Sequence, residues 1–138
     1  MAQYDPSVFP TQRRGETSGS PQRPPERLSG LALSFDVADA LASLKQEASW
    51  QHGDRNARTL AKEGGLRIVL TALRAGAGLD EHRTEGQVSI QVLAGHVRVQ
   101  LPGQAVDLPN GRLLVLASAV PHQVEAIEES AFLLTIAE

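Results

Sequence analysis

The chain has 138 residues, which suits one domain with a single hydrophobic core. Its 13 Lys and Arg against 16 Asp and Glu give a net charge of -3 and no basic stripe, so nucleic acid is not expected as a partner. The absence of cysteine excludes disulfides, thiolate nucleophiles and zinc fingers.

The first 30 residues predict a disordered tail. They contain five of the 8 prolines together with Ser, Gly and charged residues, and few large apolar side chains. No apolar core there resembles a secretion signal, and the apolar runs elsewhere fall short of the roughly 20 residues that cross a bilayer. We therefore expect a tail over residues 1–30, one domain over residues 31–138, and a soluble, cytoplasmic protein without membrane partners.

A strand and a helix are expected at the start of the domain. The sequence LALSF, residues 31–35, predicts a first strand. The sequence DVADALASLKQEAS, residues 36–49, predicts the one convincing helix, because Asp36 can cap it and apolar residues recur at helical spacing. This helix has one apolar stripe and should lie on a sheet.

From residue 57 onward the chain reads as short strands separated by Gly, Pro and Asn turn signals. Such close and even spacing predicts an all-β fold, an antiparallel sandwich or barrel. The expected strands cover residues 57–63, 66–76, 87–93, 96–101, 111–116, 122–127 and 130–137.

Alternation predicts which side chains point into the barrel. Val97, Val99 and Leu101 share one face of their strand, which leaves His96 in water with Arg98 and Gln100. By the same rule the inward residues of two other strands are Val88, Ile90 and Val92, and His122, Val124 and Ala126.

The sequence LRIVLTAL, residues 66–73, is apolar on both faces, with only Arg67 and Thr71 expected to contact water. Its outer face therefore needs a cover, either the helix or a second subunit. This apolar area predicts a homodimer.

Two histidines stand at positions that resemble the two sequence motifs of the cupin superfamily. Gly76, His82, Thr84, Val88 and Gly95 have the spacing of the first motif, which in cupins reads Gly, His, His, Glu, Gly. The second motif reads Gly, Pro, Gly, His, Asn, and here it falls on Gly111, Ala117, Ala119, His122 and Ala126. The resemblance covers roughly residues 66–137 and implies a cupin-like antiparallel β-barrel, a double-stranded β-helix of the jelly-roll type.

The resemblance implies a reduced metal site. In metal-binding cupins three residues of the first motif and the His of the second hold one divalent ion, so carry-over by position leaves His82 and His122 as two of four ligands. Thr84 would be a weak ligand and Val88 is none. A stable site generally has three or more protein donors, which would have to be completed from Glu81, Glu85, Gln87 or His52. A divalent transition metal such as Fe, Zn, Mn, Ni or Cu is compatible with this pattern but not required.

The loop SWQHGDRNARTL, residues 49–60, concentrates polar groups around the only tryptophan, Trp50. One interpretation makes it a lid over the barrel mouth, with Trp50 contacting a ligand. The other makes Trp50 a staple between helix and sheet, which is favoured because aromatic residues bury large areas.

Three functions remain open from the sequence. The first is a small-molecule binding module whose ligand contacts His82, His122, Ile90, Val92, Val124 and Trp50. The second is a metal-dependent cupin enzyme of the dioxygenase, isomerase or decarboxylase type, using His82 and His122 plus a recruited ligand. The third is an interaction or regulatory protein that dimerises through the strand that begins at Leu66.

Overall fold

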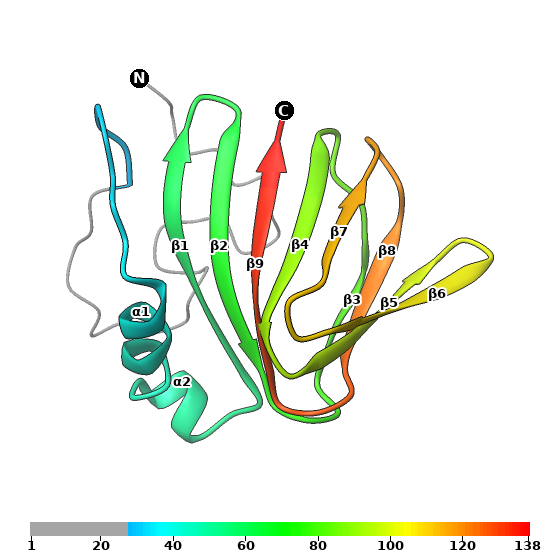
Figure 1. Cartoon of the computed structure of the whole chain (residues 1–138), viewed down its shortest axis with the longest axis horizontal. Coiled ribbons are helices and arrows are strands. Elements are labelled where there is room, and N and C mark those ends of the chain that lie inside the picture. The colour runs from blue at the N-terminus through cyan, green and yellow to red at the C-terminus, as the bar shows by residue number, and fades with distance from the viewer. Residues whose placement is uncertain (1–27) are drawn as a thin grey trace.

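The computed structural model describes residues 28–138, so nearly all of the tail expected over residues 1–30 lies outside the described residues. Within them, two short helices precede nine strands (Figure 1). The elements are α1 (Val37–Leu44), α2 (Ala48–Gln51), β1 (Arg55–Glu63), β2 (Leu66–Leu73), β3 (Gly78–His82), β4 (Gln87–Ala94), β5 (His96–Leu101), β6 (Gln104–Pro109), β7 (Leu113–Leu116), β8 (His122–Ala126) and β9 (Ser130–Ala137).

The strands form two antiparallel sheets. One has five strands in the order β1-β2-β9-β4-β7, and the other has four in the order β3-β8-β5-β6. The predicted all-β architecture is confirmed, and seven strands lie where the sequence predicts them. Two strands were not predicted: β3 begins in a glycine-rich stretch, and β6 is a short, largely exposed strand between two proline turns.

One core fills the space between the sheets. It collects the inward side chains of both, and the alternation predicted for β4, β5 and β8 is confirmed. Its buried members are Val69, Leu73, Ala77, Val88, Ile90, Val92, Val97, Val99, Leu108, Leu116, Val124, Ala126, Phe132, Leu134 and Ile136.

The predicted helix is present but shorter and broken. Asp36 caps α1 as expected, accepting a hydrogen bond from the Asp39 amide at 3.0 Å. The helix ends at Leu44 and a separate turn, α2, follows. The buried side-chain amide of Asn56, on β1, donates to the Leu44 carbonyl at 3.0 Å and to Glu47 Oε1 at 2.8 Å. Asn56 thus satisfies a carbonyl at the end of α1 and fixes the break against the sheet.

The strand predicted over residues 31–35 is not found. The Lys62 amide at the edge of β1 donates to the Leu28 carbonyl at 2.8 Å, and residues 31–35 then run on without strand pairing to the start of α1 (Figure 1). Leu31 and Phe35 are exposed to solvent. The apolar pattern was real, but these side chains have no sheet surface beneath them.

The two helices cover the outer face of β1 and β2. A second apolar cluster, separate from the interior core, contains Leu44, Trp50, Leu60, Leu70 and Ala72. Trp50 is only 4% exposed there, which confirms the interpretation of Trp50 as a staple between helix and sheet. The helices of this chain therefore cover the outer face of β1 and β2.

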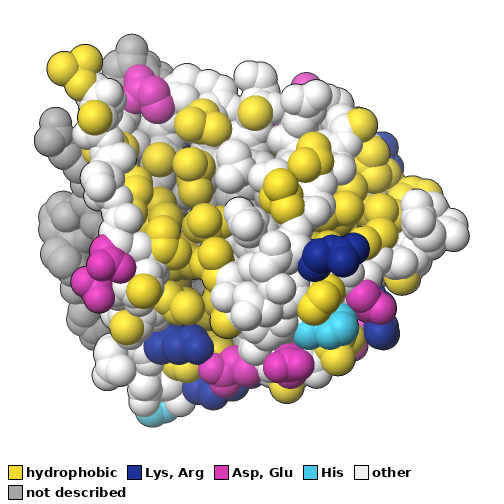
Figure 2. Space-filling model, viewed as in Figure 1, with side chains coloured by type: hydrophobic (Ala, Val, Ile, Leu, Met, Phe, Trp, Pro, Cys, Tyr) yellow, Lys and Arg dark blue, Asp and Glu magenta, His cyan; other side chains and the backbone are white. Residues whose placement is uncertain are grey.

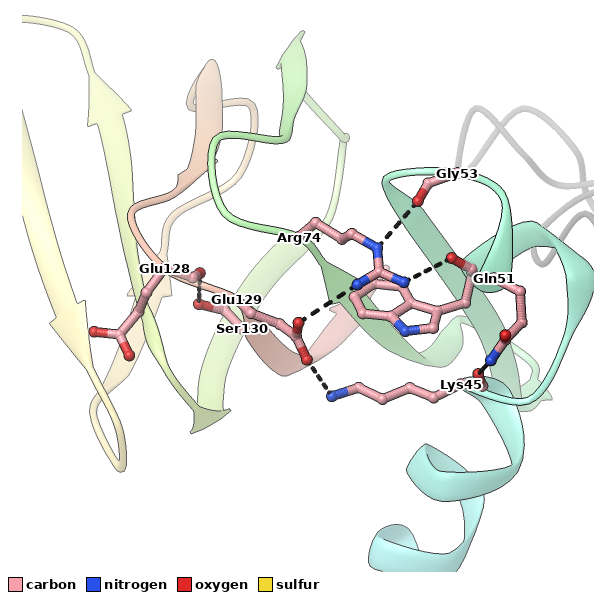
Figure 3. A network of polar contacts seen from close by, with 8 residues as sticks. Lys45, Gln51, Gly53, Arg74, Glu128, Glu129 and Ser130 are labelled. Atoms are coloured by element: carbon pink, nitrogen blue, oxygen red, sulfur yellow. Dashed lines mark hydrogen bonds and ion pairs between the residues drawn. The ribbon is translucent and has the colours of Figure 1, made fainter.

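Arg74, just after β2, reinforces the attachment of α2. Its guanidinium lies 4.1 Å from the centre of the Trp50 ring, and it donates to the Gly53 and Trp50 carbonyls at 3.2 and 3.0 Å. Glu129 contacts Arg74 at 3.7 Å and Lys45 at 2.8 Å (Figure 3). The network therefore joins α1, α2 and the loops before β3 and β9.

The cover over the five-stranded sheet is incomplete. Hydrophobic side chains gather over its outer face beside the helices (Figure 2). Leu66 on β2 is 41% exposed, and Leu113 and Val115 on β7 are 55% and 66% exposed. The chain's own helices supply much of the cover for which a second subunit was one candidate. The homodimer stays a prediction, now resting on this exposed part.

No helix among the described residues is long and apolar enough to cross a membrane.

Replacing Trp50 by Ala should lower the free energy of unfolding by about 3–5 kcal/mol, because it removes the largest side chain of the outer cluster and leaves a cavity. Urea unfolding followed by far-UV circular dichroism measures this, since the variant has no tryptophan fluorescence. His52→Ala, an exposed position two residues away, is the matched control and should change stability by less than about 0.5 kcal/mol. A loss below about 1 kcal/mol for Trp50→Ala would contradict the role given to the outer cluster.

Candidate functional site

His122, the first residue of β8, is a buried polar side chain that faces the barrel interior. It is 2% exposed, and the residues that alternate with it, Val124 and Ala126, belong to the interior core. Its Nδ1 lies 2.9 Å from the Val120 carbonyl oxygen. Because a carbonyl only accepts, Nδ1 carries the proton in this contact. A neutral imidazole with its proton on Nδ1 can coordinate a metal or accept a hydrogen bond from a ligand through Nε2.

His82 is the last residue of β3, and its backbone lies directly opposite that of His122 in the β3–β8 ladder. A register shift between Leu79 and His82 precedes this pair. The side chain of His82 lies outside the described part of the structure. The two histidines that stand 40 positions apart in the sequence are therefore brought together as backbone neighbours.

The interior also contains four polar side chains that the sequence did not reveal. Arg67 and Thr71, predicted to contact water, are 2% and 3% exposed on β2, and Lys62 and Thr59 on β1 are buried as well. On β2 the alternation of side chains could have shown this, because Arg67 and Thr71 are an even number of residues from the inward Val69 and Leu73 and so lie on the same face. On β1 a register shift between Thr59 and Ala61 breaks the alternation. The sequence alone therefore does not show that Lys62 faces the interior.

The apolar residues predicted to line the site do lie inside. Ile90, Val92 and Val124 are at most 2% exposed and pack within the interior core. Trp50 does not join them, because it belongs to the outer cluster across the five-stranded sheet. Whether any of these residues touches a ligand stays a prediction.

A separate polar groove of about 500 Å³ lies on the outer face of the four-stranded sheet, and the sequence did not indicate it. Charged residues of both signs line it, including Asp54, Arg55, Asp80, Arg98 and Glu125. Beside it, the side-chain hydrogen bond from Arg98 holds the pKa of Asp107 below its ordinary value, with a further contribution from His96. His96, predicted to be in water, is partly buried and contacts Asp107 at 3.4 Å.

Comparison with solved structures decides the fold. A cupin superfamily protein from Desulfitobacterium hafniense matches with a TM-score of 0.65 at 20% identity, covering 81% of this chain and 98% of that one. A conserved protein of unknown function from Streptococcus pyogenes matches with a TM-score of 0.62 at 20% identity, over 81% and 92% of the chains. A cupin-2 domain containing protein from Shewanella frigidimarina gives 0.61 at 16%, over 75% and 94%.

The chain has a cupin fold. No family model matches the sequence, and no curated protein matches it either. Since the identities of the three structures are at most 20%, the likeness concerns the fold and not the activity.

The three glycines that match the motif spacing all lie where the backbone is left-handed. Gly76, Gly95 and Gly111, at the motif glycines, all have left-handed φ angles, of 86°, 87° and 91°. At Gly95 a Cβ would also collide with the Glu129 carbonyl oxygen. Ala119 stands where the second motif has glycine, and its φ is 63°. Its amide donates to the Thr84 carbonyl at 2.9 Å, which ties the loops of the two motifs together.

Two ligand positions of the first motif have structural roles in this chain. Thr84, at the second His, donates its hydroxyl to the Gly86 carbonyl at 3.0 Å. Val88, at the Glu, packs in the interior core. Glu81, Glu85, Gln87 and His52, considered as replacement ligands, are all exposed. No group of three His, Asp or Glu side chains able to hold an ion occurs within the described part of the chain. Among the described residues, the donors do not make up the four-ligand cupin metal site.

Ala119→Gly should raise the free energy of unfolding by about 0.5–1 kcal/mol, because it relieves a left-handed backbone conformation that disfavours any side chain with a Cβ. Chemical denaturation measures the change. Ala117→Gly, in the same loop with a φ outside the left-handed region, is the control and should be neutral or destabilising. Equal effects at the two positions would show that the conformation of Ala119 carries no strain.

Proposed function

We propose that this cupin fold binds a small molecule in its interior, at the end of the barrel that holds His122, with His82 as a second contact. The observation that carries the proposal is the inward, buried imidazole of His122, oriented by the contact of its Nδ1 with the Val120 carbonyl. A polar group of fixed orientation surrounded by apolar walls is typical of ligand sites. Val124 and the other core residues of β8 and β5 supply such walls.

A binding module is favoured over a metal-dependent enzyme because two ligand positions of the first motif, Thr84 and Val88, have no side chain free to bind a metal ion strongly. Thr84 uses its hydroxyl within its own loop, and Val88 offers only a hydrocarbon side chain. Two imidazoles are fewer donors than a stable transition-metal site generally has. The metal-dependent alternative would need a third donor outside the described side chains.

Thermal unfolding in the presence of a library of neutral, anionic and cationic small metabolites tests the binding function. Some compounds should raise the unfolding midpoint saturably. Their affinity for His122→Ala should be lower by a factor of about ten or more, because the buried hydrogen bond between the ligand and the imidazole is lost. His96→Ala, on the outer face of β5, is the matched control and should bind like the wild type. Binding that is unaffected by His122→Ala and His122→Gln would exclude this end of the interior as the site.

Elemental mass spectrometry separates the binding module from the metal-dependent enzyme. Protein purified without chelator or added metal should carry well below one transition-metal ion per chain. Near-stoichiometric Fe, Zn, Mn, Ni or Cu that disappears in both His82→Ala and His122→Ala would instead support the enzyme and contradict a metal-free binding site.

A further inference from the structure

A single row of side chains crosses the whole five-stranded sheet on its interior face. The registers pair Lys62 with Arg67, Arg67 with Ile136, Ile136 with Val88, and Val88 with Leu116. Directly opposed residues of antiparallel strands project to the same face. Because Ile136, Val88 and Leu116 belong to the interior core, the two cations at the other end of the row face the interior as well.

The burial of these cations is unusual. Lys62 is 6% exposed and Arg67 is 2% exposed, although Lys and Arg are rarely buried to this extent. Like charges directly opposite each other in a sheet repel, and removing them from water strengthens the repulsion. Neither residue is without interactions in the structure, so the inference rests on their charge, burial and placement.

Two buried hydroxyls extend this polar strip. Thr59 is opposite Val69 and Thr71 is opposite Ala57, so both lie on the same interior face one and two rows further in. The Oγ1 atoms of Thr59 and Thr71 are buried, and neither has a hydrogen-bond partner in the described part of the structure. A buried hydroxyl with no partner costs free energy unless a ligand or water completes it. The interior faces of β1 and β2 thus carry four buried polar side chains beside the apolar Val69 and Leu73, whereas β9, β4 and β7 contribute apolar side chains to the core.

The strip shares its end of the barrel with His122. The row that starts at Lys62 ends at Leu116, the last residue of β7, and a five-residue loop leads from there to His122. Val120 in this loop packs against the interior core and accepts the hydrogen bond from His122. The cations of β1 and β2 and the imidazole of β8 therefore belong to the same end of the interior.

We infer that the ligand is a small anion with a carboxylate or phosphate group, held by Lys62 and Arg67. This inference rests on the proposed function and names the ligand class of the same site. The guanidinium of Arg67 donates in a fork that matches the paired oxygens of either group, and the ammonium of Lys62 adds a second charge. The hydroxyl of Thr59, one row further in, is the nearer of the two additional donors.

Calorimetric titration of the full chain with inorganic phosphate and with a series of small mono- and dicarboxylates tests the inference, at constant ionic strength set with sodium chloride. At least one of these probes should bind saturably to the wild type. Arg67→Gln and Lys62→Gln should each weaken that binding about tenfold or more, as expected for loss of a charged hydrogen bond. Arg98→Gln, which removes an exposed cation from the outer face of β5, is the control and should leave binding unchanged.

The arms of the experiment distinguish the ligand class from the binding function. Binding of phosphate alone or of carboxylates alone identifies which oxyanion the site takes, and either supports the inference. Neutral compounds that bind in a His122-dependent way, with no oxyanion bound, would overturn the anion and leave the proposed function standing. Absence of any binding that depends on His122, Lys62 or Arg67 would overturn both. Oxyanion binding unaffected by either substitution would place the charges of Lys62 and Arg67 in a purely internal role and contradict the inference.

Circular dichroism establishes whether the Gln variants fold. Should Arg67→Gln not fold, the wild type decides the matter through the NMR signals of its Arg67 guanidinium. A saturable shift on addition of phosphate or carboxylate supports the inference, and signals that stay unchanged overturn it.

Discussion

The register of the five-stranded sheet is the constraint on which the interior of this barrel depends. Side chains alternate between faces with a period of two, so a slip of one residue would exchange the interior set of a strand for its outer set. On β2 such a slip would place Ile68 and Leu70 inside and move Arg67 to the helix side. The ladders with β1 and β9 exclude it by pairing Arg67 with Lys62 and with Ile136.

One apolar cluster packs on each face of this sheet. Outside, α1, α2 and Trp50 pack on Leu70 and Ala72, so that much of the outer face of β1 and β2 is covered by the same chain. Inside, the apolar residues of β9, β4 and β7, together with Val69 and Leu73 of β2, pack against β5 and β8. The strands β1 and β2 also contribute four buried polar side chains to this interior. Burying charge and hydroxyls lowers stability unless they are paired, and residues retained in spite of that cost are candidates for function.

Much of the fold was predictable because most strands alternate cleanly. The inward residues of β4, β5 and β8, among them His122, follow from parity alone, and Asp36 marks the helix start by its capping chemistry. The strands β3 and β6 were missed because glycines and flanking prolines outweigh their few apolar residues. The break after Leu44 depends on Asn56, a contact between segments 12 residues apart that no local pattern shows.

The site was predictable only in part. Motif spacing selected His82 and His122, and the ladder places their backbones opposite each other. Arg67 and Thr71 were wrongly predicted to contact water. The strand is apolar on both faces, and its two polar side chains were therefore assigned to the solvent side. Lys62 was missed because the register shift after Thr59 changes the parity of β1. Charge in a strand therefore has to be judged by the register of its neighbours, which only the three-dimensional structure supplies.

The inward placement of Arg67 is the central claim, and nuclear Overhauser contacts of its side chain test it most directly. In protein with labelled methyl groups, we expect contacts between the Arg67 side chain and the methyl groups of Ile136, its cross-strand neighbour on the interior face. Contacts of Arg67 with Leu41 or Trp50 of the outer cluster would contradict the account, because they would place the cation on the helix side of the sheet.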